Sequence, residues 1–241
     1  MCVAAGRRYP RRMSEPLLRH VPATVHGRTL IRPPAGTAAA PWFVGFHGYA
    51  QSAEIFLPGL VHAAPSRDWL VASVQALHPF YTRSNEVVAN WMTSQDRELA
   101  ITDNTGYAAN VLDRLVQEYG EPSALVLAGF SQGVAMAYRC ALNGRRPCAG
   151  LVAVGGDTPP ELRGGGVQPW PRVLMLTGTA DAWYTPARLE ADAAIVRATG
   201  AEVATQVFEG GHEWSDPVVA VVREFLNRIE GLRPTSWKGS G

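Results

Sequence analysis

The chain has 241 residues, of which 46% are hydrophobic and 18% charged, a balance that fits one globular domain of enzyme size. Twenty-two basic residues against 21 acidic ones leave a net charge of +1. This gives no electrostatic reason to expect binding to nucleic acid or to an anionic membrane. No apolar run approaches the roughly 18 residues of a membrane span, so we expect no such span.

From the N-terminus, strands and helices are predicted to alternate. We expect a strand at 24–32, a buried strand at 41–48, a helical region at 52–67 broken near Pro58, a strand at 69–76, a helix at 103–120, a strand at 123–130, a helix at 132–144, strands at 149–156 and 172–179, a helix at 185–200, a strand at 202–210 and a helix at 216–229. Continuous Val, Leu and Ala in the strands predict a mostly parallel sheet flanked by helices on both faces. Function is then expected in loops at the carboxyl ends of the strands.

The termini and the cysteines bear on domain limits and compartment. Residues 1–22 are basic and lack the apolar stretch of a secretory signal, so we expect a flexible tail that starts at Met1 or at Met13. A second flexible tail is expected at 232–241, which leaves one domain at 23–231. An odd number of cysteines, three, does not suggest a disulfide framework and predicts a cytoplasmic location.

The five residues GFSQG at 129–133 stand where an apolar strand meets a helical pattern. In a G-x-S-x-G turn of this kind the serine is held on a strained strand-to-helix connection with its hydroxyl exposed. Gly129 and Gly133 are expected because strand and helix run close together there. We therefore predict that Ser131 is a nucleophile, and that the backbone N–H of Gln132 at the helix start donates to an oxyanion.

Three further loops carry the partners that a serine nucleophile needs. Asp181 follows the strand at 172–179, and His212 follows the last strand. The chain order Ser131, Asp181, His212 is that of nucleophile, acid and base, in which the imidazole transfers the proton and the carboxylate orients it. The loop GFHGYAQS at 45–52 is expected to supply the second oxyanion donor, the N–H of Tyr49.

Two alternatives stay open at these loops. Asp157, in GGDTPP, also follows a strand and is an alternative acid for His212. His47 precedes the oxyanion donor, so we expect it to order the loop rather than to act as the base.

With these motifs in place, the sequence resembles the phospholipase/carboxylesterase (acyl-protein thioesterase-like) family of α/β-hydrolase serine hydrolases over about residues 40–230. GFSQG and FHG resemble the nucleophile turn and the oxyanion strand end of that family, and ANWM at 89–92 is similar to its tryptophan loop. The resemblance implies an α/β-hydrolase fold, and it suggests Trp91 as a wall of the substrate pocket. The sequence departs from the family after His-Gly and after Asp181.

The predicted pocket is open, because DTPPELRGGGVQPWP at 157–171 is too short for a large cap domain. Trp183 and Trp214 lie at the same edge of the sheet and are expected, with Trp91, to bind substrate. No Arg or Lys lies in the four loops, so the sequence does not indicate an anionic substrate. The histidines are scattered, and we expect no metal and no cofactor.

The predicted function is therefore that of a serine carboxylesterase that hydrolyses small or medium acyl esters, with thioesters as further substrates, through an acyl-enzyme. The expected partner is a small-molecule ester, and the chain is either a monomer or a homodimer. One alternative is an aminopeptidase or amidase, with Glu54, Glu86 or Asp96 as an anchor for a substrate amine. The other is a catalytically weak ligand-binding protein.

Overall fold

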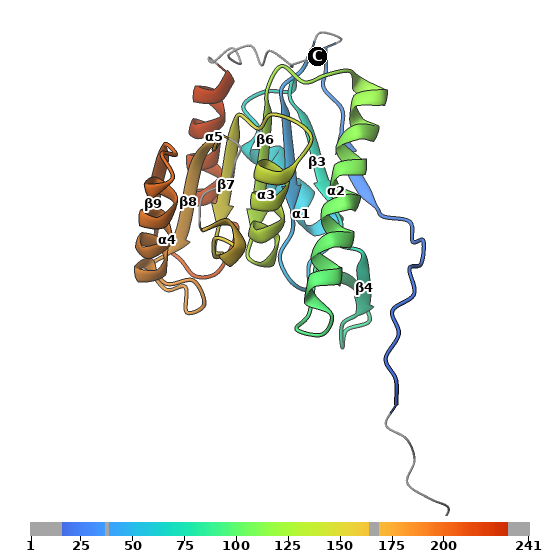
Figure 1. Cartoon of the computed structure of the whole chain (residues 1–241). Helices are drawn as coiled ribbons and strands as arrows, with labels where there is room; N and C mark the ends of the chain where they lie inside the picture. Colours follow the sequence, from blue (N-terminus) through green and yellow to red (C-terminus); the bar gives the residue numbers. More distant parts are fainter. Residues whose placement is uncertain (1–15, 37–38, 164–168, 231–241) are drawn as a thin grey trace, which may run out of the picture.

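The computed structural model describes residues 16–36, 39–163 and 169–230, and a mostly parallel sheet lies at its centre (Figure 1). Within these residues, seven strands form one sheet in the order β1-β3-β2-β6-β7-β8-β9. Their bounds in this order are Thr29–Arg32, Leu70–Val74, Trp42–Phe46, Leu125–Phe130, Gly150–Val154, Arg172–Gly178 and Val203–Phe208. Only β1, at the edge, runs antiparallel to its neighbour β3. The predicted mostly parallel sheet is confirmed.

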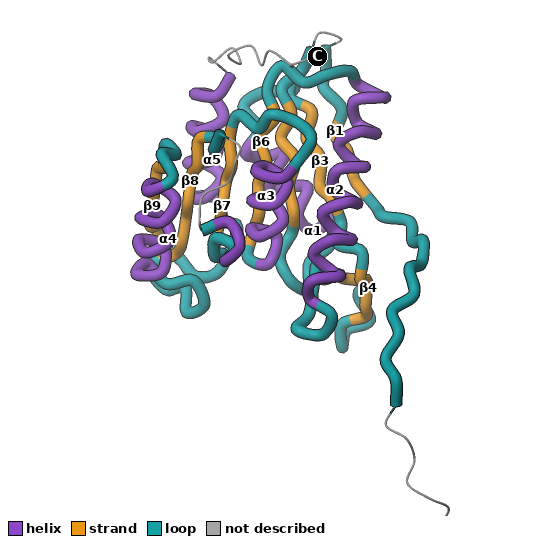
Figure 2. The backbone as a smooth tube through the Cα atoms, in the orientation of Figure 1, coloured by secondary structure: helices purple, strands orange, loops and turns teal. Residues whose placement is uncertain are grey.

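Helices cover both faces of this sheet, as predicted (Figure 2). One face is covered by α1 (Ala53–Ala63) and α5 (Asp216–Glu230), and the other by α2 (Arg97–Tyr119), α3 (Gln132–Asn143) and α4 (Pro186–Ala198). Side chains alternate between the faces along each strand: in β2, Phe43 packs on the α1 side, whereas Val44 and Phe46 pack on the α3 side. This double burial explains why the strands are apolar throughout.

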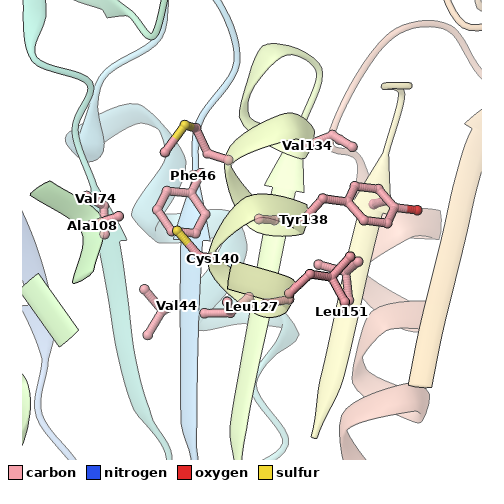
Figure 3. Packing of buried hydrophobic residues seen from close by; sticks show 14 of the residues in the cluster. Val44, Phe46, Val74, Ala108, Leu127, Val134, Tyr138, Cys140 and Leu151 are labelled. Carbon is pink, nitrogen blue, oxygen red and sulfur yellow. The ribbon is translucent and has the colours of Figure 1, made fainter. Parts of the chain in front are cut away.

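The central helix α3 packs tightly on β6, which precedes the predicted nucleophile, and on the neighbouring strands β2 and β7. Figure 3 shows Val134, Tyr138 and Cys140 of α3 over the side chains of β2, β6 and β7, among them Phe46 and Leu151. Burial raises the pKa of the Cys140 thiol to about 12, so this side chain is a neutral core residue, as its apolar surroundings in the sequence suggest.

Several details of the secondary structure differ from the sequence-based prediction. A hairpin of β4 (His78–Tyr81) and β5 (Val87–Asn90) was not predicted, since β4 is largely exposed and has no pattern of buried residues. Helix α1 is not broken at Pro58, because this proline lies on the exposed side of the helix. Proline has no N–H to donate to the carbonyl of Glu54 four residues earlier, and on the exposed side water can reach that carbonyl instead. Helix α2 begins at Arg97 rather than at 103, and β1 begins at Thr29 rather than at 24.

The segment after β7 is short, as predicted. It contains one 3₁₀ turn, Pro160–Leu162, and the described part of the chain contains no cap domain. Its position is held by the buried carboxylate of Asp192 on α4, which accepts a hydrogen bond from the Thr158 N–H at 2.9 Å and lies 3.2 Å from the Arg163 guanidinium. This loop is therefore tied to the body of the protein near the ends of the strands.

The predicted tail at 232–241 and most of the one at 1–22 lie outside the described residues, and the described part, 16–22, is exposed and has no regular structure. No helix in residues 16–36, 39–163 or 169–230 has the length and apolar character needed to cross a membrane.

Candidate active site

Ser131 occupies a strained turn between β6 and α3. It follows Phe130, the last residue of β6, and precedes Gln132, the first residue of α3. Its φ of 52° and ψ of −119° are rare for a residue other than glycine, a conformation that costs about 1–3 kcal/mol and must be held by its surroundings. The predicted strand–turn–helix arrangement around this serine is thus present.

The two glycines that flank Ser131 allow the backbones to approach closely. A Cβ atom on Gly133 would lie 2.1 Å from the carbonyl oxygen of Phe46 in β2. A Cβ atom on Gly129 would lie 2.4 Å from the backbone of Gly133 and Val134. Both distances are far below van der Waals contact, and both involve backbone atoms that cannot move aside separately. Glycine is therefore required on both sides of the turn.

Gly133→Ala should therefore destabilise the protein, by about 3 kcal/mol or more, because α3 must shift away from β2. A matched control is Gly106→Ala, in the exposed part of α2, where an added Cβ atom meets nothing within 4 Å. That change should stabilise the protein by about 0.5–1 kcal/mol, since alanine favours helix. Guanidinium chloride unfolding measures both. Equal free energies of unfolding for the wild type and Gly133→Ala would contradict the close packing at the turn.

A continuous chain of hydrogen bonds joins the three predicted catalytic residues. Nε2 of His212 lies 2.8 Å from Oγ of Ser131, and Nδ1 of the same ring lies 2.7 Å from Oδ2 of Asp181. The three side chains come from the loops after β6, β8 and β9, which the parallel sheet brings to one edge. The two histidine distances fit the spacing expected of a nucleophile, a base and an orienting acid.

The charge of Asp181 determines where the histidine proton lies. Burial, to 3% exposed, disfavours the ionised carboxyl group, but hydrogen bonds from the Tyr184 N–H, from His212 and from the Trp183 N–H together lower the pKa of Asp181 below its usual value. The ionised carboxylate only accepts hydrogen bonds, so Nδ1 of His212 carries the proton. Nε2 is then the acceptor for the Ser131 hydroxyl.

The alternative acid, Asp157, lies in a different place. Its carboxylate is exposed and forms an ion pair with Arg188 at 2.9 Å. It lines the cavity next to Ser131, but the hydrogen bond of the His212 ring is made to Asp181. Of the two acids that the sequence left open, the geometry therefore favours Asp181.

His47 has the ordering role expected for it. Its ring is fully buried, with Nδ1 2.7 Å from the carbonyl oxygen of Gly48 and Nε2 accepting from the Ala76 N–H at 3.1 Å. Desolvation lowers the pKa of His47, which keeps the ring neutral. Tyr49, two residues further, has an exposed side chain stacked on Phe80, and Tyr49 and Gln132 both line the cavity that contains Ser131.

The side chain of Gln132 has a second function that the sequence did not suggest. Its Oε1 accepts from the Trp91 N–H, and its Nε2 donates to the carbonyl oxygen of Met92, both at 2.8 Å. The tryptophan loop is thus bonded directly to the residue beside the nucleophile. A glutamine next to a serine in a turn gives no signal for such a bond, because the partners are 40 and 41 residues away.

The positions of the three predicted substrate-binding tryptophans differ. Trp183 is 72% exposed, lines the cavity and stacks on His212 with 5.7 Å between ring centroids. Trp91 is fully buried, and its indole N–H donates to the His47 carbonyl oxygen, so the expectation that it forms a pocket wall is corrected. Trp214 packs on Phe56 of α1, away from the cavity, and is corrected likewise. Met92, next to Trp91, lines the cavity instead.

The cavity at Ser131 has a volume of about 440 Å³, which is room for a small or medium substrate. Positive charges also line it, which the absence of Arg and Lys from the four loops did not indicate. Three arginines line it, all from the helices on one face of the sheet: Arg97, Arg139 and Arg188. The loop motifs could not indicate them, because the three arginines lie on helices α2, α3 and α4, outside the four loops.

Comparison with known proteins identifies the class of this fold. The chain is similar to esterase PE8, with 24% identity and a TM-score of 0.68 over 85% of this chain and 100% of that chain. It is also similar to acyl-protein thioesterase 2 of Zea mays, with 20% identity and a TM-score of 0.67 over 86% of this chain and 100% of that chain. A third similar structure is a carboxylesterase of Bacillus cereus, with 17% identity and a TM-score of 0.67 over 84% of this chain and 94% of that chain. These likenesses show the α/β-hydrolase fold, which confirms the predicted fold class.

The sequence profile of the phospholipase/carboxylesterase family matches residues 85–229, which is more than half of the chain. The protein therefore belongs to this family and is a serine hydrolase that acts on ester bonds. No curated protein matches the chain significantly.

Proposed function

We propose that this protein is a serine carboxylesterase that hydrolyses small or medium acyl esters, thioesters included, through an acyl-enzyme on Ser131. The observation that carries the proposal is the hydrogen-bond chain from Asp181 through His212 to the Ser131 hydroxyl, at the wall of a cavity. Serine alone is a weak nucleophile at neutral pH, and this arrangement supplies a base with its lone pair directed at the hydroxyl.

In the proposed reaction, Nε2 of His212 takes the proton as Ser131 Oγ attacks the ester carbonyl carbon. The tetrahedral oxyanion accepts hydrogen bonds from the backbone N–H groups of Tyr49 and Gln132. His212 then returns its proton to the leaving alkoxide or thiolate, which leaves the acyl group on Ser131. Water, deprotonated by His212, releases the acid in the second half. Asp181 stabilises the imidazolium in both halves.

The structure offers little support for an aminopeptidase. A substrate amine would need a carboxylate in the cavity, and the three acids considered for this lie elsewhere. Glu54 is paired with Arg28, Asp96 lies 3.0 Å from His20, and Glu86 accepts from Ser84 on the β4–β5 turn. None of the three is among the described residues that line the cavity. The ester reaction therefore remains the function that we propose.

A fluorophosphonate probe tests the proposal directly, because it reacts only with an activated serine. We expect labelling at Ser131, found by mass spectrometry of the digested protein, and faster turnover of p-nitrophenyl esters than of the matching p-nitroanilides. A series of p-nitrophenyl esters from two to twelve carbons would define the acyl length. If the folded protein were not labelled at Ser131, or if it hydrolysed the p-nitroanilides faster than the esters, the proposal would be contradicted. Absence of any turnover would favour the ligand-binding alternative.

A further inference from the structure

Arg139 is an unusual residue for the wall of a neutral ester site. Its side chain is 2% exposed, although it lines the cavity that contains Ser131. Nε donates to Glu161 Oε1 at 2.8 Å, and Nη2 forms an ion pair with the same oxygen at 2.7 Å. Among the described residues, Nη1 has no hydrogen-bond acceptor. Buried donors without acceptors are costly, so an acceptor is expected to be supplied.

Among the described residues that line the cavity, three are arginines and one, Asp157, is an acid. Arg188 is neutralised by Asp157, and Arg139 has one counterion in Glu161. Arg97 also lines the cavity, and its partner Glu98 is highly exposed, at 83% of its side chain. Because the Arg97–Glu98 pair is solvated and weak, Arg97 is available to a second anion.

The position of Arg139 on α3 relates this charge to the nucleophile. Ser131, Ala135 and Arg139 are spaced four residues apart, so they follow one face of the helix, and all three line the cavity. Ala135 has a small side chain and leaves space between the other two. Eight residues of helix advance about 12 Å. The long side chain of Arg139 leans toward the start of the helix, which shortens the gap between its guanidinium and Ser131. We therefore expect roughly 4–6 Å between the ester carbonyl carbon and a bound carboxylate.

We propose that the site prefers esters with a carboxylate four or five atoms from the ester carbonyl, bound by Arg139 with help from Arg97. A carboxylate in this position would supply the acceptor that Nη1 of Arg139 lacks and would form a charge-assisted hydrogen bond. The inference rests on the proposed function, because it places the ester carbonyl at Ser131. It names the substrate class, half-esters of short dicarboxylic acids or their reverse esters.

Two pairs of matched substrates test this selectivity. Monoethyl glutarate against ethyl pentanoate places the carboxylate on the acyl side, and the acetate ester of 4-hydroxybutanoate against butyl acetate places it on the alcohol side. In at least one pair we expect kcat/KM of the wild type, measured by pH-stat titration, to favour the anionic ester by about tenfold, the effect of one charged hydrogen-bonding group. A preference for the neutral ester in both pairs would overturn the inference, while leaving the proposed esterase intact.

Variants separate substrate binding from a purely structural Arg139–Glu161 pair. Arg139→Gln should lower the ratio of kcat/KM for the anionic ester to kcat/KM for the neutral ester about tenfold. Glu161→Gln removes only the carboxylate that competes for Arg139, so it should raise this ratio. If the pair merely holds the loop, both variants should change the ratio in the same direction or not at all. Arg145→Gln, an exposed arginine outside this cavity, removes the same charge and should leave the ratio unchanged within about twofold.

A binding measurement distinguishes failure of this inference from failure of the proposed function. In Ser131→Ala, calorimetry with monoethyl glutarate reports recognition without turnover. Adding Arg139→Gln should weaken binding and raise the Kd about tenfold. An equal Kd in both proteins would reject carboxylate recognition by Arg139, whatever the turnover. An Arg139-dependent Kd in a protein that hydrolyses no ester would support recognition and reject the esterase.

Discussion

Ser131→Ala should lower kcat for p-nitrophenyl esters by about 10⁵–10⁶-fold, since the acyl-enzyme cannot form without the hydroxyl oxygen. The variant should fold normally, because only one atom is removed and alanine meets the same backbone requirement as serine at φ 52°. Any remaining hydrolysis would come from the oxyanion donors and from binding alone. The measurement is stopped-flow or steady-state release of p-nitrophenol.

A matched control for this variant is Ser123→Ala, an exposed serine just before β6. Its turnover should equal that of the wild type within about twofold, as is usual for surface changes. If Ser131→Ala retained more than about a hundredth of the wild-type kcat, the serine would not be the nucleophile. Equal unfolding transitions of the two variants would show that the loss is chemical.

Asp181→Asn should lower kcat by about 10⁴-fold through a change of the histidine tautomer. Oδ1 of Asp181 accepts from the N–H groups of Trp183 and Tyr184, at 2.8 and 2.9 Å, so an asparagine must place its oxygen there. Its NH₂ group then faces Nδ1 of His212, which can only accept. The ring proton is forced onto Nε2, and the acceptor for the Ser131 hydroxyl is lost.

The comparison with Asp157→Asn separates the two acids. Asp157 lies in the cavity and pairs with Arg188, so its change should alter kcat by less than about tenfold. A loss as large as that of Asp181→Asn would show that Asp157 supports His212 during the reaction. NMR of the Nδ1 proton of His212 gives an independent reading, because that proton should disappear only in Asp181→Asn.

Family membership limits the chemistry but not the substrate. The family establishes an ester hydrolase, whereas the solved structures compared with it share at most 24% identity and establish the fold. The acyl group must therefore be inferred from the cavity of this chain. There Arg139 of α3 is informative, because a site for purely aliphatic acyl groups has no physical need for a buried guanidinium.

Some predictions from the sequence stay predictions. These are the cytoplasmic location, a homodimer, the limits of the domain, and the catalytic and oxyanion roles of the site residues. The secondary structure is decided more firmly: the strands and helices from 123 onward lie within a few residues of their predicted bounds, because runs of Val, Leu and Ala between glycines have little choice of conformation.

The sequence by itself determined the parallel α/β architecture and the order of Ser131, Asp181 and His212 along it, since both depend on local patterns and on loops that follow buried strands. Only the tertiary structure placed Asp181, and not Asp157, within hydrogen-bond distance of His212, buried Trp91, and bonded Gln132 to the tryptophan loop. It also brought Arg139 to the wall of the cavity. These outcomes depend on which side chains meet across different elements, and such long-range contacts leave no periodic signal in the chain.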